Sequence, residues 1–135
     1  ASEGYKSQDP SWFYPYLDSD RDLLDRHPVT LHLLGYQEDQ LVAYLRILPK
    51  GQSYPDHISI GRVVTAFQAR GAGLGHELMS EGISQCQQRF PNESIKISAQ
   101  QHLKAYYKQY GFTQVSEMYL EDDIPHIAMI RDCSE

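Results

Sequence analysis

The sequence predicts a mixed α/β (α+β) fold, with a largely antiparallel sheet flanked by helices. Several short runs rich in β-branched residues indicate strands, and the first of them are joined by polar turns of a few residues. A later segment, in which apolar residues recur every three or four positions, indicates an amphipathic helix. The expected order of elements is β-β-β-α-β-α-β-β, which places most strand pairs in antiparallel contact.

Three runs in the first half of the chain indicate strands. The runs TLHLLGY (30–36) and LVAYLRIL (41–48) are separated by QEDQ, which predicts a hairpin with a short polar turn. A loop rich in Gly, Pro and Asp follows, and the run ISIGRVVT (58–65) then predicts a third strand, with Gly61 as a candidate β-bulge.

The pattern changes to a helical one at Leu74 and stops at Phe90. The length corresponds to an amphipathic helix of about five turns. The residues that share its expected buried stripe are Leu74, Leu78, Gly82, Ile83 and Cys86.

Four further elements complete the predicted domain. The run SIKISA (94–99) indicates a short strand, and QHLKAYYKQY (101–110) indicates a second helix, after which Gly111 stands where a left-handed residue ends a helix. Two closing strands are expected in FTQVSEMY (112–119) and PHIAMIR (125–131).

Residues 1–28 show no clean period of either kind. They carry prolines, an acidic stretch and a group of aromatic side chains between Trp12 and Tyr16. We expect an arm or loop with aromatic anchors over 1–28 and a single domain over 29–135. A chain of 135 residues is long enough to bury a core and short for two domains.

Composition and charge exclude several classes of protein. The net charge of −6 disfavours a partner bound through its phosphates, so no nucleic acid is expected. No run approaches the roughly 18 apolar residues of a membrane span, and the polar start has no apolar signal-peptide core, so we expect no membrane contact and a cytoplasmic location. The two cysteines, Cys86 and Cys133, lack metal-ligand spacing, so free thiols and no metal are expected.

The segment RVVTAFQARGAGLGHELM (62–79) has glycines at alternate positions, Gly71, Gly73 and Gly75, between a predicted strand and a predicted helix. Such a turn presents free backbone N–H groups at the positive end of the helix dipole, and glycine lets a phosphate approach the main chain closely. The alternative is a turn whose glycines serve only the strand-to-helix geometry. We favour a pyrophosphate site.

Two common nucleotide motifs do not fit this segment. The dinucleotide fingerprint G-x-G-x-x-G would need glycine at His76, and a P-loop would need Lys followed by Ser or Thr after the glycines. Residues 68–73 (QARGAG) match instead the acetyl-CoA signature [QR]-x-x-G-x-[GA], by which the chain resembles the GNAT N-acetyltransferase superfamily. The segment YYKQYGF matches the family's Y-x-x-x-G-F helix end, and with LVAYLRIL, IGRVV, QHLKAYY and YLEDDIPHIAM it is similar to the ElaA-like branch over about residues 14–131.

The resemblance implies a GNAT-like sheet with acetyl-CoA as co-substrate. The slot for acetyl-CoA would form where the IGRVV strand splays from the parallel strand SIKISA. Backbone groups near Val63 and Val64 would bind the pantetheine arm, and the amides from Arg70 to Gly75 would hold the pyrophosphate. The implied cofactor-binding residues are Val63, Val64, Arg70, Gly71, Ala72, Gly73, Leu74 and Gly75.

Two residues are candidates for catalysis. The resemblance implies that Tyr107, four residues before Gly111, points at the sulfur, where a phenol can protonate the leaving thiolate; the alternative is a core aromatic. His126 is either a base that takes a proton from an amine near neutral pH or a hydrogen-bonded structural histidine. Because ISIGRVVT contains no glutamate, where many relatives hold a base, proton removal is assigned to His126 or to a chain of water molecules.

For several other polar residues, the sequence allows both a functional and a structural role. His102 either faces the acceptor or caps local carbonyls, and Arg62 either neutralises a substrate carboxylate or pairs with an acidic neighbour. The acidic residues Glu121, Asp122 and Asp123 either attract a cationic amine or form a solvated face, and we favour the solvated face.

The expected function is transfer of acetyl from acetyl-CoA to a primary amine, on a small molecule or peptide, by direct attack in a ternary complex. The alternative is a non-catalytic acyl-CoA-binding or assembly module. The family usually opens with a strand and one or two helices, and no such pattern precedes residue 30, so we expect an N-terminally shortened domain with an exposed sheet edge. A homodimer is expected to cover this edge, with a monomer as the alternative.

Overall fold

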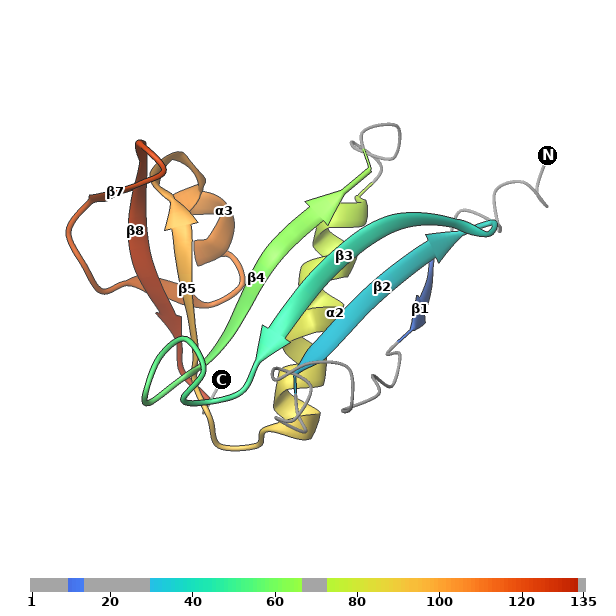
Figure 1. Cartoon of the computed structure of the whole chain (residues 1–135), viewed down its shortest axis with the longest axis horizontal. Helices are drawn as coiled ribbons and strands as arrows, with labels where there is room; N and C mark the ends of the chain where they lie inside the picture. The colour runs from blue at the N-terminus through green and yellow to red at the C-terminus, as the bar shows by residue number, and fades with distance from the viewer. Residues whose placement is uncertain (1–9, 14–29, 67–72, 134–135) are drawn as a thin grey trace.

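The computed structural model describes residues 10–13, 30–66 and 73–133. In this part of the chain eight strands form one mixed sheet with the order β1-β2-β3-β4-β5-β8-β6, and β7 pairs with β8 beside this path (Figure 1). β4 and β5 pair in parallel, and the other neighbours pair antiparallel. The predicted sheet, largely antiparallel and flanked by helices, is confirmed.

The elements follow the predicted order with additions at the start and near the end. They are β1 (Ser11–Phe13), β2 (Leu31–Gln37), β3 (Gln40–Leu48), β4 (Ile58–Thr65), α2 (Leu74–Arg89), β5 (Ile95–Gln100), a 3₁₀ helix (Gln101–Leu103), α3 (Lys104–Lys108), β6 (Phe112–Gln114), β7 (Tyr119–Glu121) and β8 (Ile124–Arg131).

β2 and β3 form the predicted hairpin. Glu38 and Asp39 make its two-residue turn, and both have positive φ, of 50° and 72°. Left-handed residues at both turn positions match the right-handed twist of the flanking strands, which keeps this pair of strands in register.

α2 packs its predicted apolar stripe against β3 and β4. Leu74, Leu78 and Cys86 are almost fully buried. Gly82 lets the helix come close to β3, because a Cβ atom at this position would lie 2.8 Å from Leu45 Cδ2. The helix ends at Arg89 with Phe90 as its C-cap, where the sequence pattern stops.

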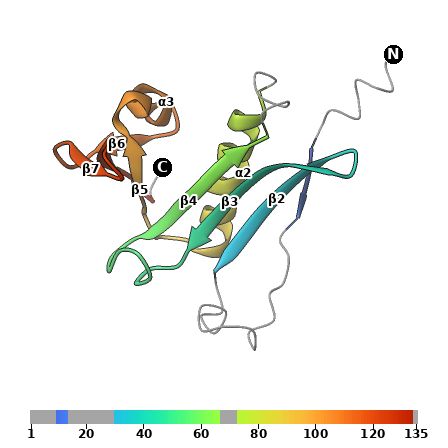
Figure 2. The ribbon, with the colours of Figure 1, turned by 45° about the horizontal axis from the view of Figure 1, so that its top comes forward.

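A single hydrophobic core fills the space between the sheet and the two helices. In Figures 1 and 2, α2 lies behind β2, β3 and β4, and α3 lies beside β5. The core includes Leu33, Leu45 and Ile47 from one half of the sheet and Ile97 and Ile127 from the other. The opposite face of the sheet therefore carries the polar residues of the same strands.

The arm expected over residues 1–28 contains a strand that the sequence did not reveal. β1 pairs antiparallel with β2, and the ring of Trp12 packs against the backbone of Gly35. The strand expected to be absent before residue 30 is thus present in a short form. Three residues are too few to display an alternating pattern, so only the aromatic anchor was visible. Residues 14–29 lie outside the described part of the chain.

Two of the later elements differ from the prediction. The second helix is divided into the 3₁₀ turn and α3, and Gly111 follows with φ of 95°, as expected of a left-handed helix end. The strand expected over 112–119 is two strands, β6 and β7, which both pair with β8. Ser116 interrupts the run, because its hydroxyl accepts the N–H of Ala128 at 2.9 Å.

Candidate functional site

β4 and β5 diverge after the first two residue pairs. The register joins Ile58 to Ile95 and Ser59 to Lys96, whereas β4 continues to Thr65. Beyond Ser59 the peptide groups of β4 therefore have no ladder partner in β5, and Figure 1 shows the two strands separating toward the start of α2. The predicted splay between these strands is confirmed.

A β-bulge redirects the free end of β4. Tyr44 pairs with Val64 and Arg46 pairs with Gly61, so two steps along β3 oppose three along β4. Arg62 lies in the bulge with φ of 55°. A bulge near Gly61 was predicted, and its effect is to turn side chains outward.

Val63 and Val64 are the exposed apolar surface that this bulge creates. Their side chains are 37% and 51% exposed, which is high for valine in a sheet. They lie on the part of β4 that has no partner in β5, next to open peptide groups. An apolar chain that carries amide groups could pack on these two valines and hydrogen-bond to the open peptide groups.

The start of α2 contains the described part of the expected anion site. Gly73 has φ of 79°, and a Cβ atom there would meet nothing within 4 Å. The first hydrogen bond of the helix runs from the N–H of Glu77 to the carbonyl of Gly73 at 3.1 Å, so the N–H groups of the first turn point away from the helix without helical partners. Arg70, Gly71 and Ala72, which were also predicted to bind cofactor, lie outside the described residues.

The three predicted residues at this helix start have different roles in the fold. Gly73 supplies a left-handed conformation, and Leu74 is buried in the core. Gly75 faces α3, where a Cβ atom would lie 3.4 Å from the hydroxyl of Tyr106. This is an ordinary van der Waals distance, so packing against α3 does not by itself require glycine at this position.

An aromatic cluster joins α3 to the start of α2. The ring of Tyr106 lies edge-on to those of Tyr107 and Tyr110, with centroids 5.1 Å and 5.3 Å away. The hydroxyl of Tyr110 is hydrogen-bonded to Nδ1 of His76 on α2. The sequence showed His76 only as a residue that breaks a glycine pattern, so its role as the link between the two helices was missed.

Tyr107 packs on the core side of the sheet, against Tyr106 and Phe112. Burial raises the pKa of its phenol above the ordinary 10.0, and Tyr106 adds to the rise. The hydroxyl therefore keeps its proton at neutral pH, which is the form required of a proton donor.

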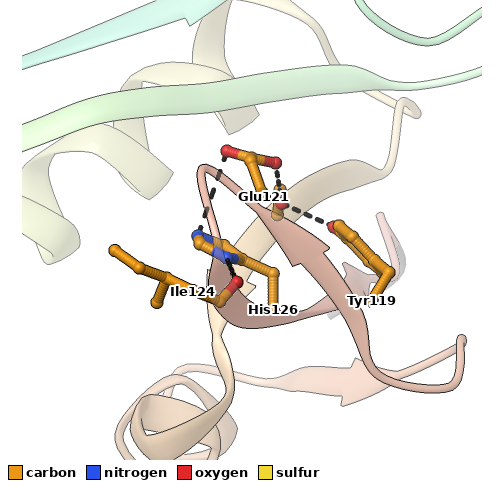
Figure 3. A network of polar contacts seen from close by, with 5 residues as sticks. Tyr119, Glu121, Ile124 and His126 are labelled. Atoms are coloured by element: carbon orange, nitrogen blue, oxygen red, sulfur yellow. Dashed lines mark hydrogen bonds and ion pairs between the residues drawn. The ribbon is translucent and has the colours of Figure 1, made fainter.

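His126 lies on β8, nearly buried, with its ring stacked on that of Tyr119 at 6.2 Å between centroids. Its Nδ1 is 2.7 Å from the carbonyl oxygen of Ile124, and because a carbonyl can only accept, Nδ1–H donates this bond. The lone pair of a neutral imidazole is then on Nε2, which lies 3.9 Å from Oε2 of Glu121 (Figure 3). The hydrogen bond to Ile124 thus leaves Nε2 as the nitrogen of the neutral ring that can accept a proton.

A chain of hydroxyls holds Glu121 from the other side. Oγ of Ser98 donates to Oε1 of Glu121 at 2.9 Å and lies 2.5 Å from the hydroxyl of Tyr119 (Figure 3). Because serine has one hydroxyl hydrogen, Tyr119 donates to Ser98 and Ser98 donates to Glu121. The sequence did not single out Ser98 or Tyr119; the available signal was the polar alternation of Lys96, Ser98 and Gln100 in a strand that is otherwise apolar.

The two catalytic candidates lie on opposite faces of the sheet. His126 is paired with Gln100 and shares its face, whereas the neighbouring Ile127 belongs to the core on which Tyr107 packs. Between these two faces, β4 and β5 pair only through Ile58–Ile95 and Ser59–Lys96. A group lying in the gap beyond these pairs could be approached by one residue from each side.

The remaining candidates are placed as follows. Burial raises the pKa of Tyr44, and the charges of Arg46 and Arg62 offset part of the rise. His102 is exposed on the 3₁₀ turn. Burial raises the pKa of Cys86 to about 12, which makes it a poor nucleophile.

The acidic cluster separates into two parts. Asp122 and Asp123 form the turn between β7 and β8, with φ of 53° and 64°, and are exposed. Glu121 instead belongs to β7 and faces Ser98 and His126. All three residues are exposed, as expected of a solvated face, but only Glu121 also contacts Ser98 and His126.

The described ranges lack two features, a metal-binding cluster and a membrane-spanning helix. No group of three or more His, Cys, Asp or Glu side chains there could hold a metal ion. None of the helices in that part of the chain is both long and apolar enough to span a membrane.

Comparison with known proteins identifies clear relatives. The model of the acetyltransferase (GNAT) domain matches residues 3–133. Protein ElaA of Escherichia coli K12 is 41% identical over 118 residues, which are 87% of this chain and 75% of that protein. An acyl-CoA N-acyltransferase from Pseudomonas aeruginosa is 35% identical, with a TM-score of 0.79 over 91% of this chain and 99% of that one. A GNAT family acetyltransferase from Elizabethkingia anophelis, solved with acetyl-CoA bound, shares the fold at 14% identity, with a TM-score of 0.66 over 92% of this chain and 98% of that one.

The parallel strands β4 and β5 diverge, β4 carries a bulge, and α2 begins after a glycine. Together with the similarity to the acyl-CoA N-acyltransferase, this mixed α+β fold defines an acyltransferase. The chain belongs to the GNAT acetyltransferase family. Its similarity to ElaA over most of its length confirms the resemblance to the ElaA-like branch.

Proposed function

We propose that this acyltransferase is an N-acetyltransferase that moves the acetyl group of acetyl-CoA to a primary amine of a small molecule or peptide. The observation that carries the proposal is the divergence of β4 from β5, which leaves open peptide groups beside the exposed Val63 and Val64. β4 and β5 separate toward the first turn of α2, whose first N–H groups have no partner within the helix and can bind phosphate.

The chemistry of the described residues fits acetyl-CoA. The pantetheine arm is a flexible chain with two amides, which the unpaired peptide groups of β4 near Val63 and Val64 can bind as a neighbouring strand would. Its pyrophosphate suits the amides of Gly73, Leu74 and Gly75, and the sequence motif assigns Arg70, Gly71 and Ala72 to the same role. The structural relative from Elizabethkingia anophelis has acetyl-CoA bound, which supports the same co-substrate here.

The acceptor amine attacks the thioester directly in a ternary complex. The acceptor arrives as an ammonium group, and Nε2 of His126 takes one proton from it to give the neutral amine that attacks, since Nδ1–H is committed to the carbonyl of Ile124. The nitrogen then forms a bond to the acetyl carbon, and the carbon–sulfur bond breaks. Tyr107 donates its proton to the thiolate, the second amine proton restores Tyr107 through solvent, and His126 releases its proton to solvent. Backbone N–H groups beside the gap polarise the thioester carbonyl.

Thiol release and thermal stabilisation test this proposal together. Free thiol released from acetyl-CoA is measured with a panel of primary amines, beside the melting temperature with and without coenzyme A. Turnover together with stabilisation supports the N-acetyltransferase. Stabilisation without turnover on any amine favours the alternative, a non-catalytic acyl-CoA-binding or assembly module, and absence of both contradicts the cofactor site.

A further inference from the structure

We propose that Glu121 binds the ammonium group of the acceptor and selects alkyl amines, which are protonated at neutral pH, over amines that are uncharged. The proposal rests on the proposed function, because it names the substrate class for the same site. Glu121 lies on β7, on the sheet face that also carries His126.

One oxygen of Glu121 is fixed and the other is available. Oε1 accepts the hydroxyl of Ser98 at 2.9 Å, and Ser98 is held in turn by Tyr119 at 2.5 Å. Oε2 lies toward His126, and the side chain of Glu121 is 52% exposed. A carboxylate that is oriented on one side and open on the other is ready to accept a charged donor.

The distance between Glu121 and His126 suits a bridging nitrogen. Oε2 and Nε2 are 3.9 Å apart, which is too long for a direct hydrogen bond. One ammonium nitrogen can lie about 2.9 Å from both atoms at once. In that position the ammonium donates to the carboxylate and presents a second hydrogen to the lone pair of His126, which is the atom that takes its proton.

The other charged groups nearby are compatible with a bound cation. Lys96 lies on the same face of β5, and its Nζ is directed over the ring of Tyr54, 4.7 Å from the centroid. Burial raises the pKa of Tyr54, and the nearby Tyr119 and Glu121 raise it further, so this phenol remains neutral beside the carboxylate. Asp122 and Asp123 are exposed in the adjoining turn, and their carboxylates lie outside the hydroxyl chain.

The chain provides a matched pair of variants for the test. Glu121→Gln removes one negative charge and keeps an oxygen to which Ser98 can donate. Asp122→Asn removes the same charge one residue away, and asparagine tolerates the left-handed φ of 53° at that position. The two variants therefore differ in whether the lost charge faces His126.

The probes are 1,4-diaminobutane, which is protonated at neutral pH, and aniline, which is not. In Glu121→Gln, KM for 1,4-diaminobutane should rise about 10-fold to 100-fold, as expected for a lost charged hydrogen bond, while kcat changes little. Turnover of aniline should be unaffected, and Asp122→Asn should behave as the unaltered protein with both amines. Equal losses in the two variants, or an unchanged KM in Glu121→Gln, would overturn the proposal.

Ser98 is a positioning residue in this scheme. Ser98→Ala should raise KM for 1,4-diaminobutane and leave aniline turnover unchanged, and Ser98→Thr, which restores a hydroxyl, should recover the KM. A purely structural role for Ser98 would lower the melting temperature and leave the KM ratio of the two amines unchanged.

Calorimetry separates this proposal from the proposed function. Binding of 1,4-diaminobutane is measured with coenzyme A present, in the unaltered protein and in Glu121→Gln. Binding that depends on Glu121 without any turnover supports the ammonium site and contradicts the acetyltransferase activity. Turnover of both amines without preference supports the activity and overturns the ammonium site, and absence of both binding and turnover of 1,4-diaminobutane overturns the ammonium site as well.

Discussion

Tyr107 is held in its protonated form by its surroundings. Because burial raises the pKa of this phenol above 10.0, the neutral hydroxyl prevails at neutral pH. The residue can therefore act as an acid when a thiolate forms beside it at that pH.

We expect Tyr107→Phe to lower turnover by about 10²-fold, within the range for a positioned acid, and to leave coenzyme A affinity unchanged. Turnover per folded molecule and affinity are measured on the same preparation, with Tyr36→Phe on β2 as a control that removes a hydroxyl away from the gap. Full activity in Tyr107→Phe would remove this residue from the mechanism. A lower melting temperature with preserved turnover would identify it as a core aromatic.

At the level of elements, the first turn of α2 depends on Gly73. Its φ of 79° is a conformation that β-branched residues avoid, while asparagine adopts it at low cost. Any side chain there would project into space where a Cβ atom meets nothing within 4 Å, which is where the proposed pyrophosphate would lie.

Gly73→Asn should therefore keep a melting temperature near that of the unaltered protein and lose coenzyme A affinity. Gly73→Val should lose affinity and also stability, by about 1–2 kcal/mol, because the backbone is strained. Calorimetry on the folded variants measures the affinity. Unchanged affinity in Gly73→Asn would contradict the pyrophosphate assignment. This variant is the clearer test, because asparagine does not strain the backbone as valine does.

β1 depends on a close contact between Trp12 and Gly35. A Cβ atom at Gly35 would lie 2.9 Å from Cε3 of the indole, so Gly35→Ala must displace a rigid ring. We expect the variant to be less stable by about 1–3 kcal/mol and its tryptophan emission to shift to longer wavelength, since Trp12 is the single tryptophan. Gly61→Ala, where a Cβ atom meets nothing within 4 Å, should change neither quantity.

How far the sequence predicts these elements depends on their length. α2 and the hairpin of β2 and β3 were predicted because four helical turns and two alternating runs repeat their pattern several times. β1 and β7 are three residues long and were missed, because their pairing with a longer strand defines them.

The same limit applies to the site. Gly73 and Tyr107 belong to short motifs that can be read along the chain, whereas the contact between Glu121 and Ser98 could not be predicted because the two residues are distant in sequence. Contacts across strands become visible only when the register is known. The link between His76 and Tyr110 was missed for the same reason.

At the level of the whole molecule, β1 ends the sheet on one side in the part of the chain that the structure describes. We propose that two chains associate there. Phe13 is 52% exposed and lies edge-on to Tyr36, beside an open hollow of about 600 Å³ that Leu34 also lines. An exposed strand edge with an adjoining aromatic surface favours pairing with a second copy.

Light scattering should then give a species of twice the 15.5 kDa of one chain. Phe13→Ser should shift it toward the single chain, because the exposed ring is lost while Trp12 still anchors β1. Leu120→Ser, at a position 63% exposed on β7, is the control and should leave the mass unchanged. A single-chain mass for the unaltered protein at micromolar concentration would contradict the dimer.

The two residue pairs that join β4 to β5 also bear on folding cooperativity. In the described part of the chain, the sheet divides into two units, β1 to β4 and β5 to β8. They are joined by the pairs Ile58–Ile95 and Ser59–Lys96, and both pack on the same core. A ligand that binds between β4 and β5 would contact both units. Its binding energy would therefore reduce local unfolding of either unit by itself. Coenzyme A should therefore slow amide hydrogen exchange in β4 and also in β8, with which it need not be in contact. Protection limited to β4 and the first turn of α2 would mean that ligand binding does not couple the unfolding of the two units.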